Sequence, residues 1–155
     1  MALLDANVLY PARLRDLLMR LAIAGIYQAR WSDQILDEWF HNLLQDRPDL
    51  QAAQMDRTRQ LMTTALPDAT VAGYKQLIED QALPDPDDRH VLAATLAAEA
   101  AMLVTANVRD FPGDKIPSTL QVLSPDEFVL ALATEDLDAV VDVIESQAAA
   151  LANPP

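Results

Sequence analysis

Short apolar segments that alternate with stretches of helical periodicity constrain the fold of this chain more than any other feature. Four such segments lie at residues 2–5, 26–31, 101–105 and 120–123, and each is too short to form a helix. Short apolar runs are typical of strands that are buried on both faces, as in a parallel sheet with helical crossovers. We therefore predict an α/β fold with a mainly parallel central sheet flanked by helices.

The intervening segments carry apolar residues at the three- and four-residue spacing of a helix. This spacing predicts helices at residues 14–24, 32–44, 48–65, 87–98 and 137–151. Gly25 is expected to end the first helix and Ser32 to cap the second. The sequence Ser-Pro-Asp-Glu at 124–127 predicts a further helix start. The pattern at residues 71–78 is ambiguous and slightly favours a helix. We expect turns or loops at residues 83–88 and 107–115, and a frayed end at residues 153–155.

Composition narrows the class of protein further. The chain has 155 residues, of which 51% are apolar, and it contains no cysteine. The apolar content allows the chain to bury a core, so disorder along its whole length is excluded. The absence of cysteine excludes a disulfide framework, a thiolate zinc site and a thiol nucleophile. No apolar run approaches the roughly 20 residues of a membrane span, and the N-terminus lacks the basic start of a signal peptide. We expect a cytoplasmic protein.

The net charge bears on the partners of the chain. Lys and Arg total 11 and Asp and Glu total 24, which gives a formal charge of −13. Such a chain is repelled by nucleic acid and by anionic membranes. Two interpretations are open: the acids coat a solvated surface, or a few of them converge on a cation.

Several acids stand just beyond the apolar segments, at the edge where parallel sheets bind ligands. Asp5 ends the first segment, and Asp110 follows the third, after Asn107. Glu38 lies at the edge of the apolar stripe of the 32–44 helix. Taken singly, each could be a cap, a turn residue or a boundary residue. Their recurrence favours a shared site.

A turn that opens the next helix adds three more acids, Asp85, Asp87 and Asp88. One acid is enough to cap a helix, and Asp88 shares the buried face of this one. Carboxylates so close together repel one another unless a cation intervenes. Without cysteine, such a set selects Mg²⁺ or Mn²⁺ over zinc. His41 and His90 lack paired ligand spacing, and we assign both to the core edge or the surface.

Four motifs, taken together and in this order, resemble the PIN domain, and in particular the VapC-type ribonuclease toxins of prokaryotic toxin–antitoxin pairs. They are LLDANVL at 3–9, the helix that holds Glu38, LPDPDDRHVLA at 83–93 and VTANVRDF at 104–111. The resemblance covers residues 1–123 as a nuclease domain. Residues 124–155 are similar to a C-terminal helical extension of one VapC subgroup.

The resemblance implies an endoribonuclease that hydrolyses RNA phosphodiester bonds with carboxylate-bound Mg²⁺ or Mn²⁺. It assigns the catalytic and metal-binding roles to four acids, Asp5, Glu38, Asp88 and Asp110. Asn7 and Thr105 would orient these ligands. The chain departs from the family at Asn107, where many members have an acid, and Asp85 could take over part of that role.

The resemblance also implies partners: an RNA substrate, a cognate antitoxin protein and a second copy of the chain in a homodimer, with no membrane. Candidate contacts to the RNA backbone are Arg13, Arg15, Arg89 and Arg109. The final helix carries an apolar stripe of Val140, Val143, Ile144 and Leu151. This stripe either packs on its own domain or is covered by a second chain.

Other protein classes fit the residues less well. A haloacid-dehalogenase-type phosphatase needs a second acid where Asn7 stands, and a receiver domain needs paired acids after the first strand. A non-catalytic PIN-like module that only binds RNA or protein stays as the alternative. The four retained acids speak against it.

Overall fold

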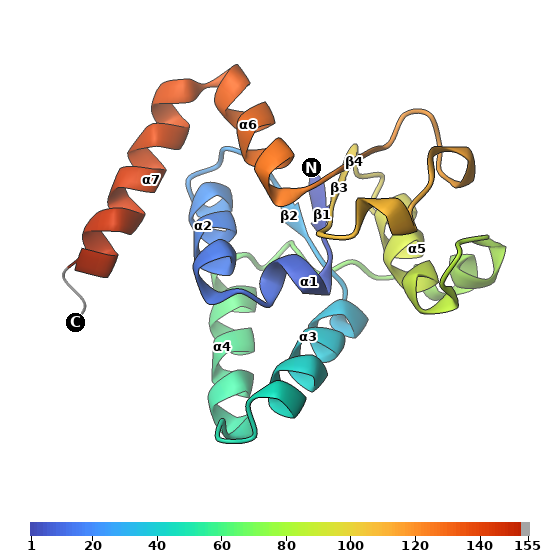
Figure 1. The fold of residues 1–155 in the computed structure, drawn as a ribbon, viewed down its shortest axis with the longest axis horizontal. Coiled ribbons are helices and arrows are strands. Elements are labelled where there is room, and N and C mark those ends of the chain that lie inside the picture. Colours follow the sequence, from blue (N-terminus) through green and yellow to red (C-terminus); the bar gives the residue numbers. More distant parts are fainter. Residues whose placement is uncertain (153–155) are drawn as a thin grey trace.

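The centre of the fold is a sheet of four parallel strands in the order β2-β1-β3-β4 (Figure 1). The computed structural model describes residues 1–152, so the expected fraying of residues 153–155 lies outside the described part. The strands are β1 (Ala2–Leu4), β2 (Ala29–Arg30), β3 (Met102–Val104) and β4 (Gln121–Leu123). In register, Leu3 of β1 lies opposite Leu103 of β3, which lies opposite Val122 of β4. The predicted α/β fold is confirmed, with every strand pair parallel.

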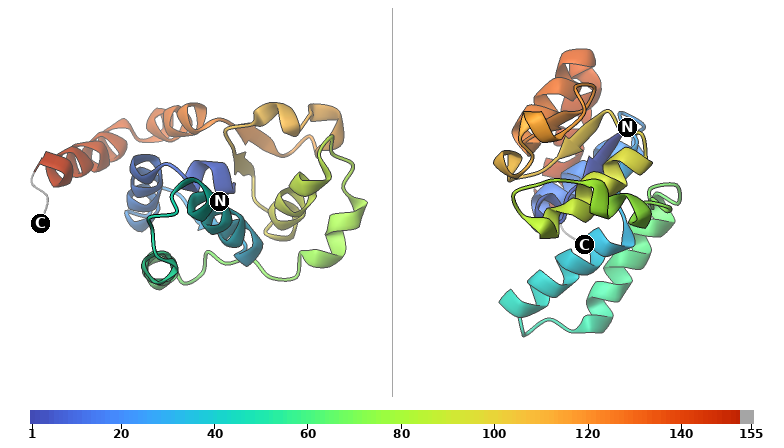
Figure 2. Two further views of the ribbon diagram at one scale, coloured as in Figure 1. Left: turned by 60° about the horizontal axis from the view of Figure 1, so that its bottom comes forward. Right: turned by 90° about the vertical axis from the view of Figure 1, so that its right-hand side faces the viewer.

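Helices cover the sheet and extend beyond it. They are α1 (Ala6–Leu9), α2 (Ala12–Ile23), α3 (Asp33–Asp46), α4 (Ala52–Ala65), α5 (Arg89–Ala97), α6 (Pro125–Glu135) and α7 (Leu137–Ala152). In Figure 1, α2, α6 and α7 lie to one side of the sheet, α5 lies to the other, and α3 and α4 form a hairpin below it. Figure 2 shows α6 and α7 running along one edge of the molecule. Among the described residues, no helix combines the length and apolar character needed to cross a membrane.

The helix caps and the helix-ending glycine predicted from the sequence are present in the structure. Gly25 has a φ of +78° just after α2, a conformation that glycine adopts without strain. The Ser32 hydroxyl accepts a hydrogen bond from the backbone N–H of Ile35 at 3.0 Å and caps α3. Ser124 and Glu127 form a reciprocal capping box at the start of α6. These caps set the points at which the chain leaves β2 and β4.

Several predicted boundaries were wrong. α4 begins at Ala52 rather than near Pro48, because Gln51 is its cap residue and the Gln51 N–H donates to the Gln54 side chain at 3.5 Å. Instead of a helix over 71–78, a short 3₁₀ helix, η1 (Lys75–Asp80), follows Gly73, whose φ of +73° interrupts helical geometry. The strand predicted over 26–31 shortens to β2. The turn at 83–88 contains one 3₁₀ turn, η2 (Pro86–Asp88), and the 107–115 loop contains two, η3 (Val108–Asp110) and η4 (Gly113–Lys115).

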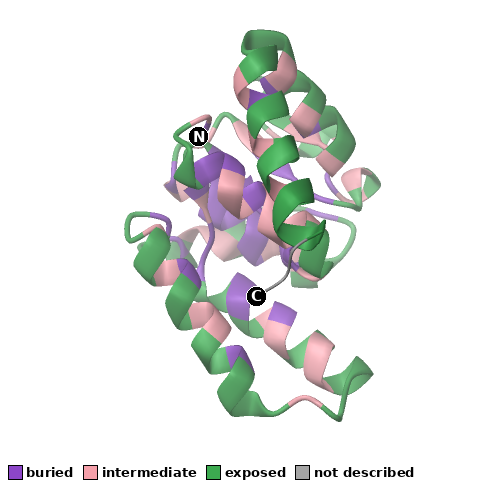
Figure 3. Ribbon diagram, turned by 90° about the vertical axis from the view of Figure 1, so that its left-hand side faces the viewer, coloured by how far each residue is buried: buried purple, intermediate pink, exposed green. Residues whose placement is uncertain are grey.

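The C-terminal helices share the core of the preceding residues. Phe128, Leu132 and Val140 belong to the same buried cluster as the strand residues. The Phe128 ring meets Tyr27 edge-on, with 4.9 Å between the ring centroids. Figure 3 shows buried residues gathered around the strands and exposed residues along α7. Of the predicted α7 stripe, Val140 and Val143 pack on the domain, while Ile144 and Leu151 are exposed.

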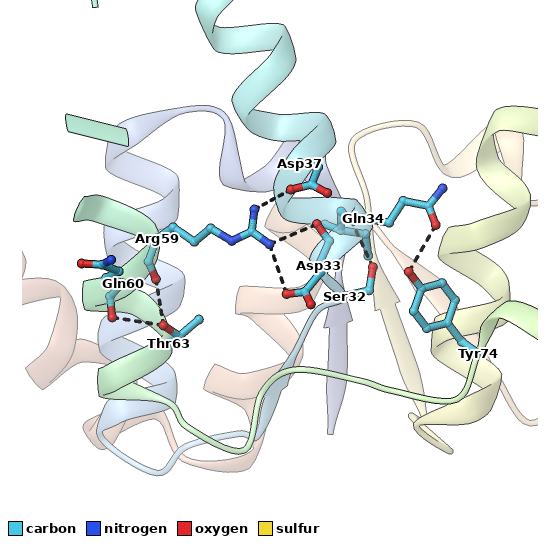
Figure 4. A network of polar contacts seen from close by, with 9 residues as sticks. Ser32, Asp33, Gln34, Asp37, Arg59, Gln60, Thr63 and Tyr74 are labelled. Carbon is cyan, nitrogen blue, oxygen red and sulfur yellow. Dashed lines mark hydrogen bonds and ion pairs between the residues drawn. The ribbon is translucent and has the colours of Figure 1, made fainter. Parts of the chain in front are cut away.

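The N-terminal end of α3 is held from two sides (Figure 4). The Arg59 guanidinium of α4 pairs with Asp33 at 3.1 Å and with Asp37 at 2.5 Å. On the other side, the Tyr74 hydroxyl donates a hydrogen bond to Gln34 Oε1 at 3.2 Å. These contacts fix the orientation of α3, which carries one of the candidate acids.

Candidate active site

Asp5 stands at the carboxyl end of β1, where the chain turns into α1. Its side chain is buried, with only 4% of the residue exposed. Its Oδ1 accepts a hydrogen bond from the Ala6 N–H at 2.7 Å, so it caps α1. Its Oδ2 accepts a hydrogen bond from the Thr105 hydroxyl at 2.9 Å, which comes from the end of β3. Because β1 and β3 are neighbours in the sheet, their polar ends meet, as expected for a parallel sheet.

Thr105 and Asn7 form a polar link beneath the Asp5 carboxylate. Thr105 is completely buried, and its Oγ1 accepts hydrogen bonds from Asn7 Nδ2 at 3.2 Å and from the Asn107 N–H at 3.1 Å. Asn7 Nδ2 also lies 3.5 Å from Asp5 Oδ2, and Asn7 Oδ1 accepts a hydrogen bond from the Ala106 N–H at 3.0 Å. These bonds hold the Asp5 carboxylate in one orientation.

The Asp5 carboxyl is held in an environment that disfavours its charge. The pKa of Asp5 is raised from 3.8 to about 6, chiefly because the carboxyl is buried and in part because Glu38 carries a negative charge nearby. The hydrogen bonds from Thr105 and Ala6 lower this pKa in part. A cation near Asp5 would therefore relieve an electrostatic cost that the fold imposes.

Asp88 lies half-buried at the junction of η2 and α5. Burial, followed by repulsion from nearby carboxylates, raises its pKa to about 6. The carboxylates that act on it are those of Asp5, Asp110, Asp85 and Glu38. Its Oδ2 is buried, and no hydrogen-bond donor in the described part of the chain reaches it. The structure therefore brings the four predicted acids into one electrostatic cluster, with one carboxylate oxygen left unpaired.

Glu38 contacts a side chain that the sequence analysis did not place at the site. His90 is 6% exposed, and its Nε2 lies 3.6 Å from Glu38 Oε1. A positive charge on His90 lowers the pKa of Asp5, so the imidazole faces the acid cluster. Its position two residues after Asp88, in the first turn of α5, was the available signal. That signal is weak, because no second histidine lies at ligand spacing from His90.

The remaining predicted side chains lie at the rim. Asp85 is exposed, and its Oδ1 accepts a hydrogen bond from the Asp87 N–H at 2.9 Å, so Asp85 caps η2. Asp110 is half-buried in η3, just after the exposed Asn107. Asp85 and Asp110 act on Asp88 by charge, whereas Asn107 contributes its backbone N–H to Thr105.

Comparison with known proteins identifies the family. The sequence model of the PIN domain matches residues 1–109, which is more than two thirds of the chain. The chain belongs to the PIN domain family. It is also similar to a protein of Mycobacterium tuberculosis named "Putative ribonuclease VapC50", with 38% identity over 69 residues. That match covers 44% of this chain and 41% of the relative, so the chain spans less than half of the curated relative it matches. No solved structure matched the chain.

The four arginines suggested as RNA contacts differ in their surroundings within this PIN domain. Arg15 Nη1 donates a hydrogen bond to the Leu9 carbonyl at 2.8 Å, and its guanidinium lies 4.7 Å from the ring centroid of Trp39. It therefore fastens α2 to α1 and α3. Arg89 is half-buried, and its Nε is buried with no partner among the described residues. The other two, Arg13 and Arg109, are exposed.

The donor set of the PIN domain suits a hard divalent cation. It consists of carboxylates, one of which presents the buried, unpaired Asp88 Oδ2. Within residues 1–152, however, no three His, Asp or Glu side chains are grouped so that they could hold a metal ion. The assignment of such an ion to Asp5, Glu38, Asp88 and Asp110 stays a prediction.

Proposed function

We propose that this chain is a metal-dependent endoribonuclease that acts as the toxin of a toxin–antitoxin pair. One observation carries the proposal: the carboxylates of Asp5, Glu38 and Asp110 act by charge on that of Asp88, whose Oδ2 is buried and unpaired. Carboxylates with raised pKa values that lie together are typical of functional sites, and a bound cation would offset their repulsion. The similarity to a protein named as a ribonuclease supports the choice of RNA as substrate.

The proposed chemistry assigns separate tasks to the side chains. Bound Mg²⁺ or Mn²⁺ would polarise the scissile phosphate and lower the pKa of a water molecule. Asp5, held by Thr105 and Ala6, supplies the fixed carboxylate of the site. Asp88, Glu38 and Asp110 supply carboxylates from three other elements and neutralise the cation.

The phosphodiester must approach an acidic protein, so cationic side chains at the rim would assist binding. Arg13, Arg89 and Arg109 remain candidates for contacts to the RNA backbone. Arg15 is the weakest of the four candidates, because its guanidinium is engaged by Leu9 and Trp39.

A cognate antitoxin is the proposed protein partner, as the similarity to a VapC protein suggests. An acid cluster without its cation is a natural site for an arginine or lysine side chain. We expect an antitoxin to inhibit by placing such a residue near Asp5 and Asp88, and excess Mn²⁺ to weaken that inhibition. A homodimer is also proposed.

The test is RNA cleavage with purified protein, measured with Mn²⁺, with Mg²⁺ and with EDTA. We expect cleavage that requires the metal and falls at least 100-fold in both Asp5→Asn and Asp88→Asn. Asp87→Asn is the matched control, because Asp87 is an exposed neighbour of Asp88. Wild-type rates in folded Asp5→Asn protein would refute the assignment. RNA binding without cleavage in any metal would favour the non-catalytic module instead.

A further inference from the structure

The helix α7 carries an apolar stripe whose large side chains stay exposed in the described part of the chain. Its large members are Leu137 at 61% exposed, Val141 at 38%, Ile144 at 42% and Leu151 at 53%. With Ala148 between them, these residues follow a spacing of four, three, four and three. At about 100° per residue, they fall within an arc of roughly 80° on the helix. This is the a/d seam of a helix that pairs with another helix.

The two sides of this stripe differ. On one side, Val140 is buried, and the Gln147 side chain donates hydrogen bonds to the Arg13 carbonyl at 2.9 Å and to Asp16 Oδ2 at 3.1 Å. This side fastens α7 to α2. On the other side, Asp138, Asp142 and Glu145 are exposed.

The charge of the surrounding segment has one sign only. Residues 116–155 contain no Lys, Arg or His, and they contain seven acids: Asp126, Glu127, Glu135, Asp136, Asp138, Asp142 and Glu145. None of the seven forms an ion pair within the described residues. An apolar seam flanked by unpaired negative charge selects a partner with positive flanks.

A second copy of α7 would fit this seam poorly. In an antiparallel pair, the two acidic flanks would face each other and repel. In a parallel pair, each acidic flank would face the side that holds Val140 and Gln147, which already packs on α2. Both self-pairings are therefore disfavoured by the structure.

We propose that the exposed seam of α7 docks an amphipathic helix of another protein, one that carries Lys or Arg beside its own apolar seam. The inference does not depend on the nuclease activity, because it rests on residues outside the acid cluster.

The test uses two synthetic three-heptad peptides and the full-length chain. Both peptides carry Ile at a and Leu at d. One has Lys at e and g, and the other has Glu at the same positions. Binding is measured by fluorescence anisotropy at low and high salt. The variant Ile144→Asp interrupts the seam, and Leu61→Asp on α4 is the matched control, because Leu61 is also an exposed aliphatic side chain, at 62%, and lies outside α7. Circular dichroism confirms that both variants are folded.

We expect the Lys peptide to bind the wild type and the Leu61→Asp control alike. Its affinity should fall at least 10-fold with Ile144→Asp and at least 10-fold between 50 and 500 mM salt. The Glu peptide should not bind. Equal binding of both peptides, or binding of neither, would overturn the proposal. So would sedimentation that shows a wild-type dimer lost in Ile144→Asp, since a second copy would then cover the seam.

Discussion

Replacing Asp5 by asparagine should stabilise the protein at neutral pH when no metal is present. Burial raises the pKa of this carboxyl to about 6, against 3.8 in the unfolded chain. Between these two values the folded state binds more protons than the unfolded state. The wild type therefore loses stability as pH rises from about 4 to 7. Asparagine cannot ionise and does not share that loss.

The size of the effect follows from the shift and from the hydrogen bonds. A shift from 3.8 to about 6 corresponds to roughly 3 kcal/mol at pH 7. Against this, an asparagine amide loses one acceptor position for the Thr105 hydroxyl, which costs about 1 kcal/mol. The net gain should be about 2 kcal/mol at pH 7, or a rise in Tm of about 4–8 °C for a chain of this length. At pH 4 the gain should vanish or become a small loss, because the wild-type carboxyl is then protonated.

The assay is urea unfolding of both proteins in EDTA at pH 7.0 and pH 4.0. Asp56→Asn serves as a control, because Asp56 is exposed on α4. Its free energy of unfolding should differ from that of the wild type by the same amount at both pH values. If the Asp5→Asn protein is less stable than the wild type at pH 7.0, and by the same amount at pH 4.0, then Asp5 is not held in the environment described here.

Three further outcomes are expected. Mn²⁺ affinity, measured by calorimetry, should fall at least 10-fold between pH 7.5 and pH 5.0, because protons compete for Asp5 and Asp88, whose pKa values lie near 6; a constant affinity would place the ion elsewhere. Thr105→Val should weaken Mn²⁺ binding by about 10–100-fold, because it removes the hydroxyl donor that orients Asp5. The control Thr95→Val should leave Mn²⁺ binding unchanged, because it removes only a hydrogen bond to a backbone carbonyl. Leu103→Ala, at the centre of β3, should lower the free energy of unfolding by about 2–5 kcal/mol in chemical denaturation, and a loss below 1 kcal/mol would contradict its place in the core.

Sequence alone was sufficient for the parallel sheet and for the acids at its edge. Short apolar strands ending in polar residues leave few arrangements, and Asp5 and Thr105 meet because β1 and β3 are neighbours. The caps at Ser32 and Ser124 were also predictable, since a single side chain satisfies the backbone N–H groups at a helix start.

The features that sequence did not reveal depend on contacts between distant segments. The slight preference for a helix over the ambiguous residues 71–78 was wrong, because the Val71 N–H donates a hydrogen bond to the Trp31 carbonyl and draws the chain alongside β2 before Gly73 turns it. His90 was undervalued because its contact with Glu38 joins α5 to α3, and no local pattern encodes that distance. The sequence did not show which apolar side chains of α7 are exposed. This depends on the burial of Val140, which sets the side of the helix that faces α2.

The central claim, that these acids hold a divalent cation, is tested most directly by anomalous diffraction from crystals grown with Mn²⁺. We expect a strong anomalous peak bound by Asp5 and Asp88, with Glu38 or Asp110 completing the carboxylate set. No peak at this edge of the sheet in crystals that hold Mn²⁺ elsewhere, or a peak that persists unchanged in Asp5→Asn crystals, would contradict it.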